Sequence, residues 1–318
     1  MNTAPCAILS HEPVSRGRTR LTATITLGSV TATRVLEYEG TTRPPEAMFP
    51  GLAEGTWQEH ESRLPADSWD RESGLLRTCV QTWVLRSGGA TILVDTGAGD
   101  GKDRPGTPAF HQLRTGFLDR LAAAGVAPED VDFVVNTHLH SDHVGWNTRL
   151  DNGEWRPTFP NATYLLPRAD HDFWNPAGPH RPKHARANEN VFADSIAPVV
   201  HSGQARLWED HYDIDEALRL EPAPGHTPGS SVLTVRSGTD RALFVGDLLH
   251  HPLQFAEPDL NSCFCEDPTL AAATRHKLLG QAADERALVF PAHIGSAPAV
   301  EIVRDGAKFT VTRWGIDG

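Results

Sequence analysis

The sequence predicts an α/β fold in which β-sheets lie in the middle and helices pack on the outside. Three observations support this prediction. Segments rich in Val, Ile and Thr occur in both halves of the 318-residue chain, and segments with helical spacing of apolar residues follow several of them. No short-period repeat or low-complexity tract is visible, which argues against a solenoid or a disordered chain.

The N-terminal half contains strand-like segments separated by turn residues. We expect strands, in chain order, at 21–39 with a turn at Gly28, at 78–86, at 91–95 and at 132–135. The Gly88–Gly89 pair between two of these segments is typical of a tight hairpin turn. Apolar residues at helical spacing predict a helix over 109–124, and Gly125 is a suitable stop for it.

The C-terminal half continues the alternation of strands and helices. We expect strands at 162–166, 217–221, 231–236, 241–246 and 287–290, and helices at 168–174, 190–197 and 268–284. Two segments, 40–74 and 176–190, show no clear period and are rich in polar residues and Pro. We interpret both as long surface excursions, of a kind that often forms a lid or a dimer contact.

Charge and composition exclude several classes of protein. The chain has 29 basic and 41 acidic residues, a net charge of −12, which argues against a nucleic-acid partner. No apolar run approaches the length that spans a bilayer, so a membrane partner is not expected. The four cysteines are not spaced as a disulfide framework, and Met1–Ser10 does not resemble a signal peptide. We therefore expect a cytoplasmic protein that acts on a small molecule.

Four residues of metal-ligand type occur within six positions: His138, His140, Asp142 and His143. His138 and His140 are two residues apart at the end of an expected strand, so both imidazoles lie on one face of an extended chain. Imidazole and carboxylate groups together suit zinc and similar divalent ions. The alternative, a polar loop with histidines by chance, explains this density poorly.

Three further candidate ligands lie downstream, each in a loop or directly after an apolar strand. They are His226 in PAPGHTPGS, Asp247 in LFVGDLLH and His293 in VFPAHIG. Functional residues commonly collect in loops that a rigid scaffold positions. Each candidate is weak evidence alone, but with the 138–143 cluster they predict a metal site.

These motifs resemble those of the metallo-β-lactamase-fold hydrolases. The matching segments, in order, are THLHSDH at 137–143, GHTPGS at 225–230, GD at 246–247 and PAH at 291–293. The resemblance covers roughly residues 20–310 and implies one domain over 1–318. It also implies a four-layer αββα sandwich of two mixed sheets with helices outside, and a homodimer that uses the 40–74 excursion.

The resemblance also implies a role for each candidate residue. His138, His140 and His226 would bind one metal ion, and Asp142, His143 and His293 a second. Asp247 would bridge the two ions, and Asp95 would lie behind them and hold the metal-binding loop. The expected ions are two Zn²⁺, with manganese, iron or cobalt as alternatives.

Two such ions, typically about 3.5–4 Å apart, would lower the pKa of a bound water and so supply a hydroxide for attack on an ester, lactone or organophosphate. Asp142 or Asp247 would carry a proton to the leaving group.

The segment 246–259 is most similar to the lactonase and methyl-parathion-hydrolase branch. In that branch the third residue after the bridging aspartate faces the substrate. Here this residue is His250, where acyl-homoserine-lactone lactonases usually have Tyr.

Aromatic side chains are expected to shape the substrate pocket, with Trp146, Trp174 and Phe255 as candidates. Core packing is the alternative for each of them.

Two other activities stay open on the same site. One is a mononuclear-iron oxidoreductase like the persulfide dioxygenases, and the other is a hydrolytic dehalogenase. A non-catalytic protein with a structural metal is a third possibility, although structural sites are closed and need fewer ligands.

Overall fold

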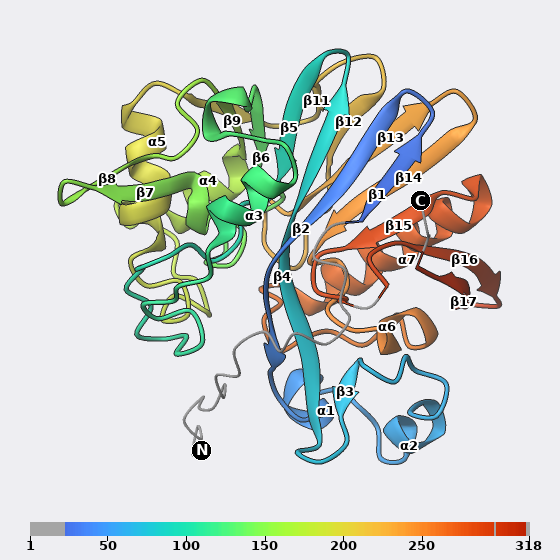
Figure 1. The fold of residues 1–318 in the computed structure, drawn as a ribbon. Helices are drawn as coiled ribbons and strands as arrows, with labels where there is room; N and C mark the ends of the chain where they lie inside the picture. The colour runs from blue at the N-terminus through green and yellow to red at the C-terminus, as the bar shows by residue number, and fades with distance from the viewer. Residues whose placement is uncertain (1–22, 296, 316–318) are drawn as a thin grey trace.

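Two mixed β-sheets form the centre of the computed structural model, which describes residues 23–295 and 297–315 (Figure 1). The predicted domain over 1–318 includes residues that the structure does not describe. Cys6, one of the four cysteines, is among them. In the first sheet the strand order is β1-β2-β4-β5-β6-β9-β10, and β3 pairs with β4. The strands of this sheet are β1 Thr24–Leu27, β2 Val30–Thr41, β3 Trp69–Asp70, β4 Leu75–Ser87, β5 Ala90–Val94, β6 Phe133–Val135, β9 Thr163–Pro167 and β10 Ala205–Trp208.

The second sheet follows the sequence without crossing, in the order β11 to β17. Its strands are β11 Tyr212–Asp213, β12 Leu218–Pro222, β13 Ser231–Ser237, β14 Asp240–Gly246, β15 Leu288–Pro291, β16 Val300–Asp305 and β17 Lys308–Trp314. Only the β14–β15 pair is parallel, with α7 (Pro268–Glu285) as its connection. The strands β7 (Thr148–Asp151) and β8 (Glu154–Pro157) form a separate hairpin.

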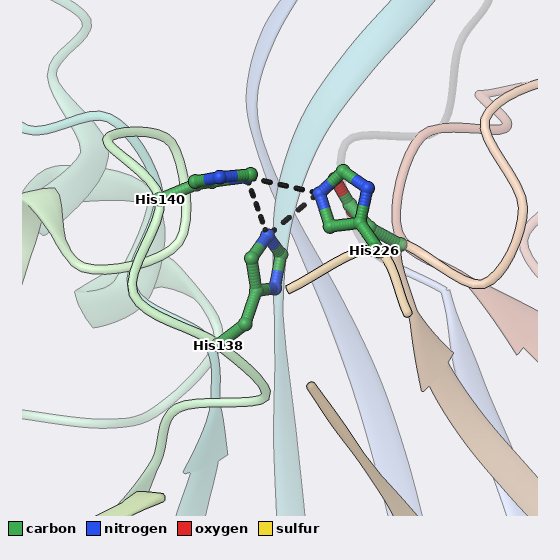
Figure 2. Close-up of side chains that lie close together, drawn as sticks. His138, His140 and His226 are labelled. Carbon is green, nitrogen blue, oxygen red and sulfur yellow. Dashed lines mark hydrogen bonds and ion pairs between the residues drawn. The ribbon is translucent and has the colours of Figure 1, made fainter. Parts of the chain in front are cut away.

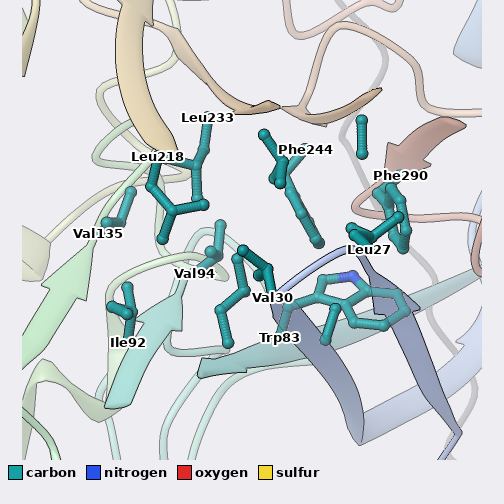
Figure 3. Packing of buried hydrophobic residues seen from close by; sticks show 14 of the residues in the cluster. Leu27, Val30, Trp83, Ile92, Val94, Val135, Leu218, Leu233, Phe244 and Phe290 are labelled. Atoms are coloured by element: carbon teal, nitrogen blue, oxygen red, sulfur yellow. The ribbon is translucent and has the colours of Figure 1, made fainter. Parts of the chain in front are cut away.

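Three groups of buried side chains separate the molecule into four layers. Trp83, Phe244 and Phe290 belong to the group that fills the space between the two sheets (Figure 3). A second group packs α3 (Phe117–Ala123) against the outer face of the first sheet, and a third packs α7 against the outer face of the second. The predicted αββα sandwich is confirmed, because each sheet buries one face on the other and one face under helices.

The turn between β1 and β2 shows why glycine is needed at one predicted turn. Gly28 has φ +59°, and a Cβ there would lie 2.5 Å from Ser237 Oγ in the second sheet. The Gly28 amide also donates to Asp240 Oδ2 at 2.7 Å. The turn predicted at Gly28 therefore divides the 21–39 segment into two strands and ties one sheet to the other.

The helix predicted over 109–124 is wrong at its beginning. The structure forms only α3 (Phe117–Ala123) there, and Gly125 follows it at φ +77°. Gln112 and Gly116 adopt φ values of +53° and +68°, which a continuous right-handed helix does not allow. Phe110 and its neighbours pack instead against Tyr38 and Val80, so tertiary contacts override the helical spacing.

The remaining helices are short and lie around the sheets. They are α1 Pro45–Met48, α2 Thr56–His60, α4 Arg168–Trp174, a π-helical turn at Phe192–Ile196, α5 Ala197–His201, α6 Leu253–Ala256, and 3₁₀ turns at Pro128–Asp130 and Gly145–Asn147. The 40–74 excursion contains α1, α2 and β3 and has a small core of its own around Met48, Phe49 and Trp57. Within the described part of the chain, every helix is too short or too polar to cross a membrane.

Candidate metal centre

The seven predicted ligands meet at one edge of the sandwich, between the two sheets. His138 to His143 lie in the turns that follow β6, and His226 lies between β12 and β13. Asp247 directly follows β14, and His293 lies two residues after β15. Gly246 has φ +48°, and a Cβ at this position would come within 2.8 Å of Thr137 Oγ1. Glycine therefore lets the Asp247 segment approach the segment that carries His138.

One set of donors, which we call the His138 group, consists of His138, His140 and His226. Their rings point toward one another, those of His138 and His140 from the segment after β6 and that of His226 from the loop between β12 and β13, as Figure 2 shows. His140 Nδ1 is 3.1 Å from His138 Nε2 and 2.9 Å from His226 Nε2. Asp247 Oδ2 lies 3.1 Å from His226 Nε2 and 3.5 Å from His138 Nε2. All four side chains are buried, so a cation among them would be shielded from water.

The other set, which we call the His143 group, consists of Asp142, His143 and His293. Asp142 contributes Oδ1 at 3.8 Å from His143 Nε2 and Oδ2 at 3.8 Å from His293 Nε2. The second oxygen of Asp247 faces this group, with Oδ1 3.1 Å from His143 Nε2 and 2.9 Å from His293 Nε2. Asp247 thus presents one oxygen to each group, the arrangement that a ligand shared by two ions requires.

The donor atoms of the two groups fit divalent metal ions. Among the described residues, His143 Nε2 and Asp247 Oδ1 are buried atoms of the two donor sets that form no hydrogen bond. A buried polar atom without a partner costs about 1–3 kcal/mol. Both atoms face the centre of the His143 group, where coordination of a cation would satisfy them.

The charge state of the cluster depends on burial and on Asp247. Burial lowers the pKa of His138 and of His140 well below the usual value, which keeps these rings neutral and able to coordinate. Burial opposes protonation of His226 and His143 too, but the Asp247 carboxylate outweighs it. This carboxylate raises the pKa of His226 to about 10 and that of His143 well above its usual range. Protons and metal ions would therefore compete for these two rings.

Asp95 lies behind the His143 group, at the end of β5, and holds two parts of the metal-binding segment. Its carboxylate accepts hydrogen bonds from Thr137 N at 2.8 Å and from Thr137 Oγ1 at 2.8 Å. Its Oδ2 is also 2.9 Å from His143 Nδ1, which turns His143 Nε2 toward Asp247. These contacts are the ones expected of a residue that orients a ligand without touching the metal.

A cavity of about 560 Å³ opens above the two groups. His140, Asp142, His226, Asp247 and His293 contribute to its lining. The rest of the lining is mainly apolar and is contributed by β2, β4, α1, both excursions, the segment before α3 and the segment between β14 and α7. The additional residues that line it are Tyr38, Thr42, Arg43, Pro44, Ala47, Met48, Leu75, Thr78, Val80, Gly106, Thr107, Pro108, Phe110, Ser141, His184, Ala187, Asn188, His250 and Phe264.

His250 and His251 face opposite directions. His250 lines the cavity, with Nε2 3.3 Å from Asp247 Oδ2 and 3.3 Å from Ser262 Oγ. His251 points into the 40–74 excursion, where its Nε2 is 3.1 Å from the Ser68 carbonyl oxygen. Burial lowers the pKa of each ring to about 4. Of these two side chains, only that of His250 faces the cavity.

The structure does not bring the three predicted pocket aromatics to the cavity lining. Trp146 stacks on Phe117 in the core and donates from Nε1 to Glu37. Trp174 lies behind the ring of His140, at 5.2 Å between centroids, and Phe255 packs against Trp314. Core packing, the alternative stated for all three, describes where Trp146 and Phe255 lie.

Three other aromatic residues line the cavity instead: Tyr38, Phe110 and Phe264. They come from β2, from the irregular segment before α3 and from the segment before α7. No local pattern distinguishes them from core residues. Phe264 stands between two cysteines, and Phe110 fits the helical spacing of a helix that does not form. Only the tertiary arrangement identifies them.

Comparison with known proteins agrees with the fold. The model of the metallo-beta-lactamase superfamily matches residues 80–293. Metallo-beta-lactamase domain-containing protein 1 of Mus musculus is 30% identical over 254 residues, which cover 79% of this chain and 74% of that protein. The N-acyl homoserine lactonase AttM of Rhizobium radiobacter is 29% identical over 137 residues, covering 41% of this chain and 45% of AttM.

Solved structures of similar fold cover almost the whole chain. AidC, a dizinc quorum-quenching lactonase in complex with a product, has a TM-score of 0.75 and 22% identity, covering 93% of this chain and 98% of AidC. The hydrolase AbOPH has a TM-score of 0.75 and 23% identity, covering 93% and 97% of the two chains. The family model includes all seven donor residues, and the chain therefore belongs to the metallo-beta-lactamase superfamily.

Proposed function

We propose that this chain is a hydrolase that depends on two divalent metal ions and cleaves an ester, lactone or organophosphate. The observation that carries the proposal is the position of Asp247. Its Oδ2 lies 3.1 Å from His226 of the His138 group, and its Oδ1 lies 2.9 Å from His293 of the His143 group. A mononuclear site would leave one of these donor groups without a purpose.

The residues around the cavity suit hydrolysis. When bound, two divalent ions would lower the pKa of a water held between them and polarise the substrate oxygen that gains charge. The six residues of the two groups, with Asp247 as the seventh donor, would hold these ions. We propose zinc for both positions, because imidazole and carboxylate ligands suit it, although manganese, iron and cobalt accept the same ligands.

Three side chains are proposed to act directly on the reacting groups. Asp142, whose side chain is 18% exposed, and Asp247 can each accept a proton on a carboxylate oxygen and return it to the leaving group. His250 Nε2 lies 3.3 Å from Asp247 Oδ2 and faces the cavity, where it can hydrogen-bond to a substrate oxygen. No Ser or Cys nucleophile is required in this scheme.

The cavity and the relatives support a neutral substrate with an apolar part. Tyr38, Met48, Val80, Phe110 and Phe264 form most of the wall away from the donors. Apolar walls with few polar groups bind apolar parts of a ligand and orient its reactive bond. The partial likeness to AttM, an N-acyl homoserine lactonase, makes an acylated lactone the first substrate to test.

A panel assay tests the proposal. The wild-type chain, loaded with Zn²⁺, is assayed on an acylated lactone, an aryl ester, a phosphotriester and a chlorinated aromatic compound. Asp247→Ala is assayed beside it, with Asp172→Ala as the matched control at a carboxylate 55% exposed. We expect at least one substrate to be hydrolysed. For Asp247→Ala we expect a loss in kcat/KM of about 100-fold or more and fewer than two metals per chain, because removing even an outer-shell partner costs up to about 100-fold.

Metal analysis separates the proposal from its alternatives. A chain that holds one iron and consumes oxygen with a persulfide substrate would identify a mononuclear oxidoreductase instead. Release of chloride without ester or lactone cleavage would identify a dehalogenase. Full activity after removal of all metal by a chelator would contradict every version of the metal-dependent mechanism.

A further inference from the structure

Asp170 is a fully buried carboxylate that lies outside the two donor groups, on α4 (Arg168–Trp174). No pattern in the sequence distinguishes Asp170, because it lies near the start of an ordinary short helix. A buried carboxylate needs strong hydrogen-bond partners to offset its desolvation. The identity of these partners indicates what the residue does.

One partner lies inside the 138–143 segment. The backbone N–H of Leu139 donates to Asp170 Oδ2 at 2.9 Å. Leu139 separates His138 from His140, so this bond fixes the peptide between two members of the His138 group. The backbone between two ligands determines where both imidazoles point.

Two partners lie in the loop that carries the third member of the group. Thr227 Oγ1 donates to Asp170 Oδ2 at 2.9 Å, and Gly229 N donates to Asp170 Oδ1 at 2.6 Å. Thr227 directly follows His226. A Cβ on Gly229 would lie 2.8 Å from Asp170 Oδ1 and 2.4 Å from Asp170 N, so glycine is what permits this close approach.

We infer that Asp170 is a positioning residue that clamps the His138–His140 segment to the His226 loop and thereby sets the geometry of the His138 group. Among the bonds described, the Asp170 oxygens accept hydrogen bonds only from the His138–His140 segment and the His226 loop. No other described contact of α4 requires a carboxylate at this buried position. The His143 group has different supports, Asp95 and the Cys79 carbonyl oxygen. Asp95 also reaches the His138 group through Thr137, whereas Asp170 contacts the loops of the His138 group alone among the bonds described. The inference rests on the proposed two-metal function.

The test measures metal affinity at each group rather than activity. Apo protein is titrated with Zn²⁺ in competition with a chromophoric chelator, and the binding step of the His138 group is identified with His140→Ala. In Asp170→Asn, the amide NH₂ must face at least one of the three donors Leu139 N, Thr227 Oγ1 and Gly229 N, so at least one hydrogen bond is lost. We expect the His138-group step to weaken by about 10- to 100-fold, the range found for residues behind metal ligands, and the other step to change by less than about threefold.

Two more variants make the test decisive. Asp172→Asn is the matched control, because it makes the same chemical change on α4 at a carboxylate that contacts only its neighbour His171 and is 55% exposed. Its metal binding should equal that of the wild type. Thr227→Val keeps the side-chain shape but removes the hydrogen bonds of Oγ1 to Asp170 and to Ser230, and it should weaken the same step by a smaller factor. This variant serves if Asp170→Asn does not fold.

The outcomes separate this inference from the proposed function. Two metals in the wild type with both steps unchanged in Asp170→Asn and Thr227→Val would overturn the inference alone. Equal weakening of both steps, together with a lower apo melting temperature, would show a merely structural role and also overturn it. A wild-type chain that binds no metal would overturn the proposed function and the inference together.

Discussion

At the scale of single residues, buried carboxylates hold the loops of the metal centre in place. Asp95 orients His143, Asp170 joins two ligand loops, and Glu37 supports the segment after β5. Glu37 accepts hydrogen bonds from Ala98 N at 2.6 Å and from Trp146 Nε1 at 2.7 Å. Each carboxylate accepts hydrogen bonds from elements far apart in sequence. No local sequence pattern reveals such contacts.

Glu37 gives a prediction about pH. Burial raises the pKa of Glu37 from 4.5 to about 7, so the folded chain binds a proton there that the unfolded chain loses earlier. Stability from this group is complete below pH 4.5 and is lost as the pH rises through about 7. At about 1.4 kcal/mol per pKa unit, the loss amounts to about 3 kcal/mol.

The measurement compares Glu37→Gln with the wild type by denaturant unfolding of the apo protein from pH 5 to pH 8. At pH 5 the variant should be less stable than the wild type by about 1–3 kcal/mol. The amide NH₂ of the introduced glutamine is itself a donor and would face the N–H groups that donate to Glu37 in the wild type. This difference should shrink toward pH 8, since only the wild type loses stability at this position. Glu46→Gln, on the exposed face of α1, is the control. A difference that is constant over this range would contradict the prediction.

At the scale of elements, the donors lie where strands end. The parallel pairs β5–β6 and β14–β15 end at the same edge as the loop between β12 and β13, so Asp95, Asp247 and His293 reach one place. The helix α7 connects β14 to β15, and Asp267 caps its N-terminus by accepting a hydrogen bond from Leu270 N at 2.9 Å. The sheets supply rigidity and the loops supply chemistry, which is the usual division in such folds.

The C-terminal end of α7 gives a prediction about stability. Arg286 is exposed and adopts φ +54° and ψ +38°, a left-handed conformation that favours glycine at the end of a helix. Arg286→Gly should therefore raise the free energy of unfolding by about 0.5–1 kcal/mol. Arg286→Ala keeps the Cβ and should give no gain. Thermal unfolding of the three proteins is the measurement, and equal effects of Gly and Ala would refute the explanation.

At the scale of the whole molecule, the metal centre lies between the two sheets. His138 and His140 follow a strand of the first sheet, whereas His226, Asp247 and His293 follow strands of the second. A bound ion would therefore link the two halves of the sandwich, in addition to the apolar core around Trp83. Metal binding and global stability should be coupled.

This coupling predicts that Zn²⁺ raises the melting temperature of the apo protein in a concentration-dependent way. A free concentration of one thousand times Kd stabilises a folded protein by about 4 kcal/mol. Mg²⁺ prefers octahedral oxygen ligands and should give little or no shift, which makes it the control. Differential scanning calorimetry at several metal concentrations is the measurement. An identical melting curve with and without Zn²⁺ would contradict the coupling.

The amino-acid sequence alone predicted central sheets with helices outside, most strand positions and seven candidate donors, because strand periodicity and the H-x-H-x-D-H motif are local signals. The four-layer αββα arrangement followed from the resemblance to a known family. The sequence misjudged the helix before Gly125 and named Trp146, Trp174 and Phe255 for a pocket that other residues line. The tertiary structure alone decided which aromatics face the cavity, which way His250 points and what Asp170 holds. These features depend on contacts between segments dozens of residues apart, and local spacing carries no information about such contacts.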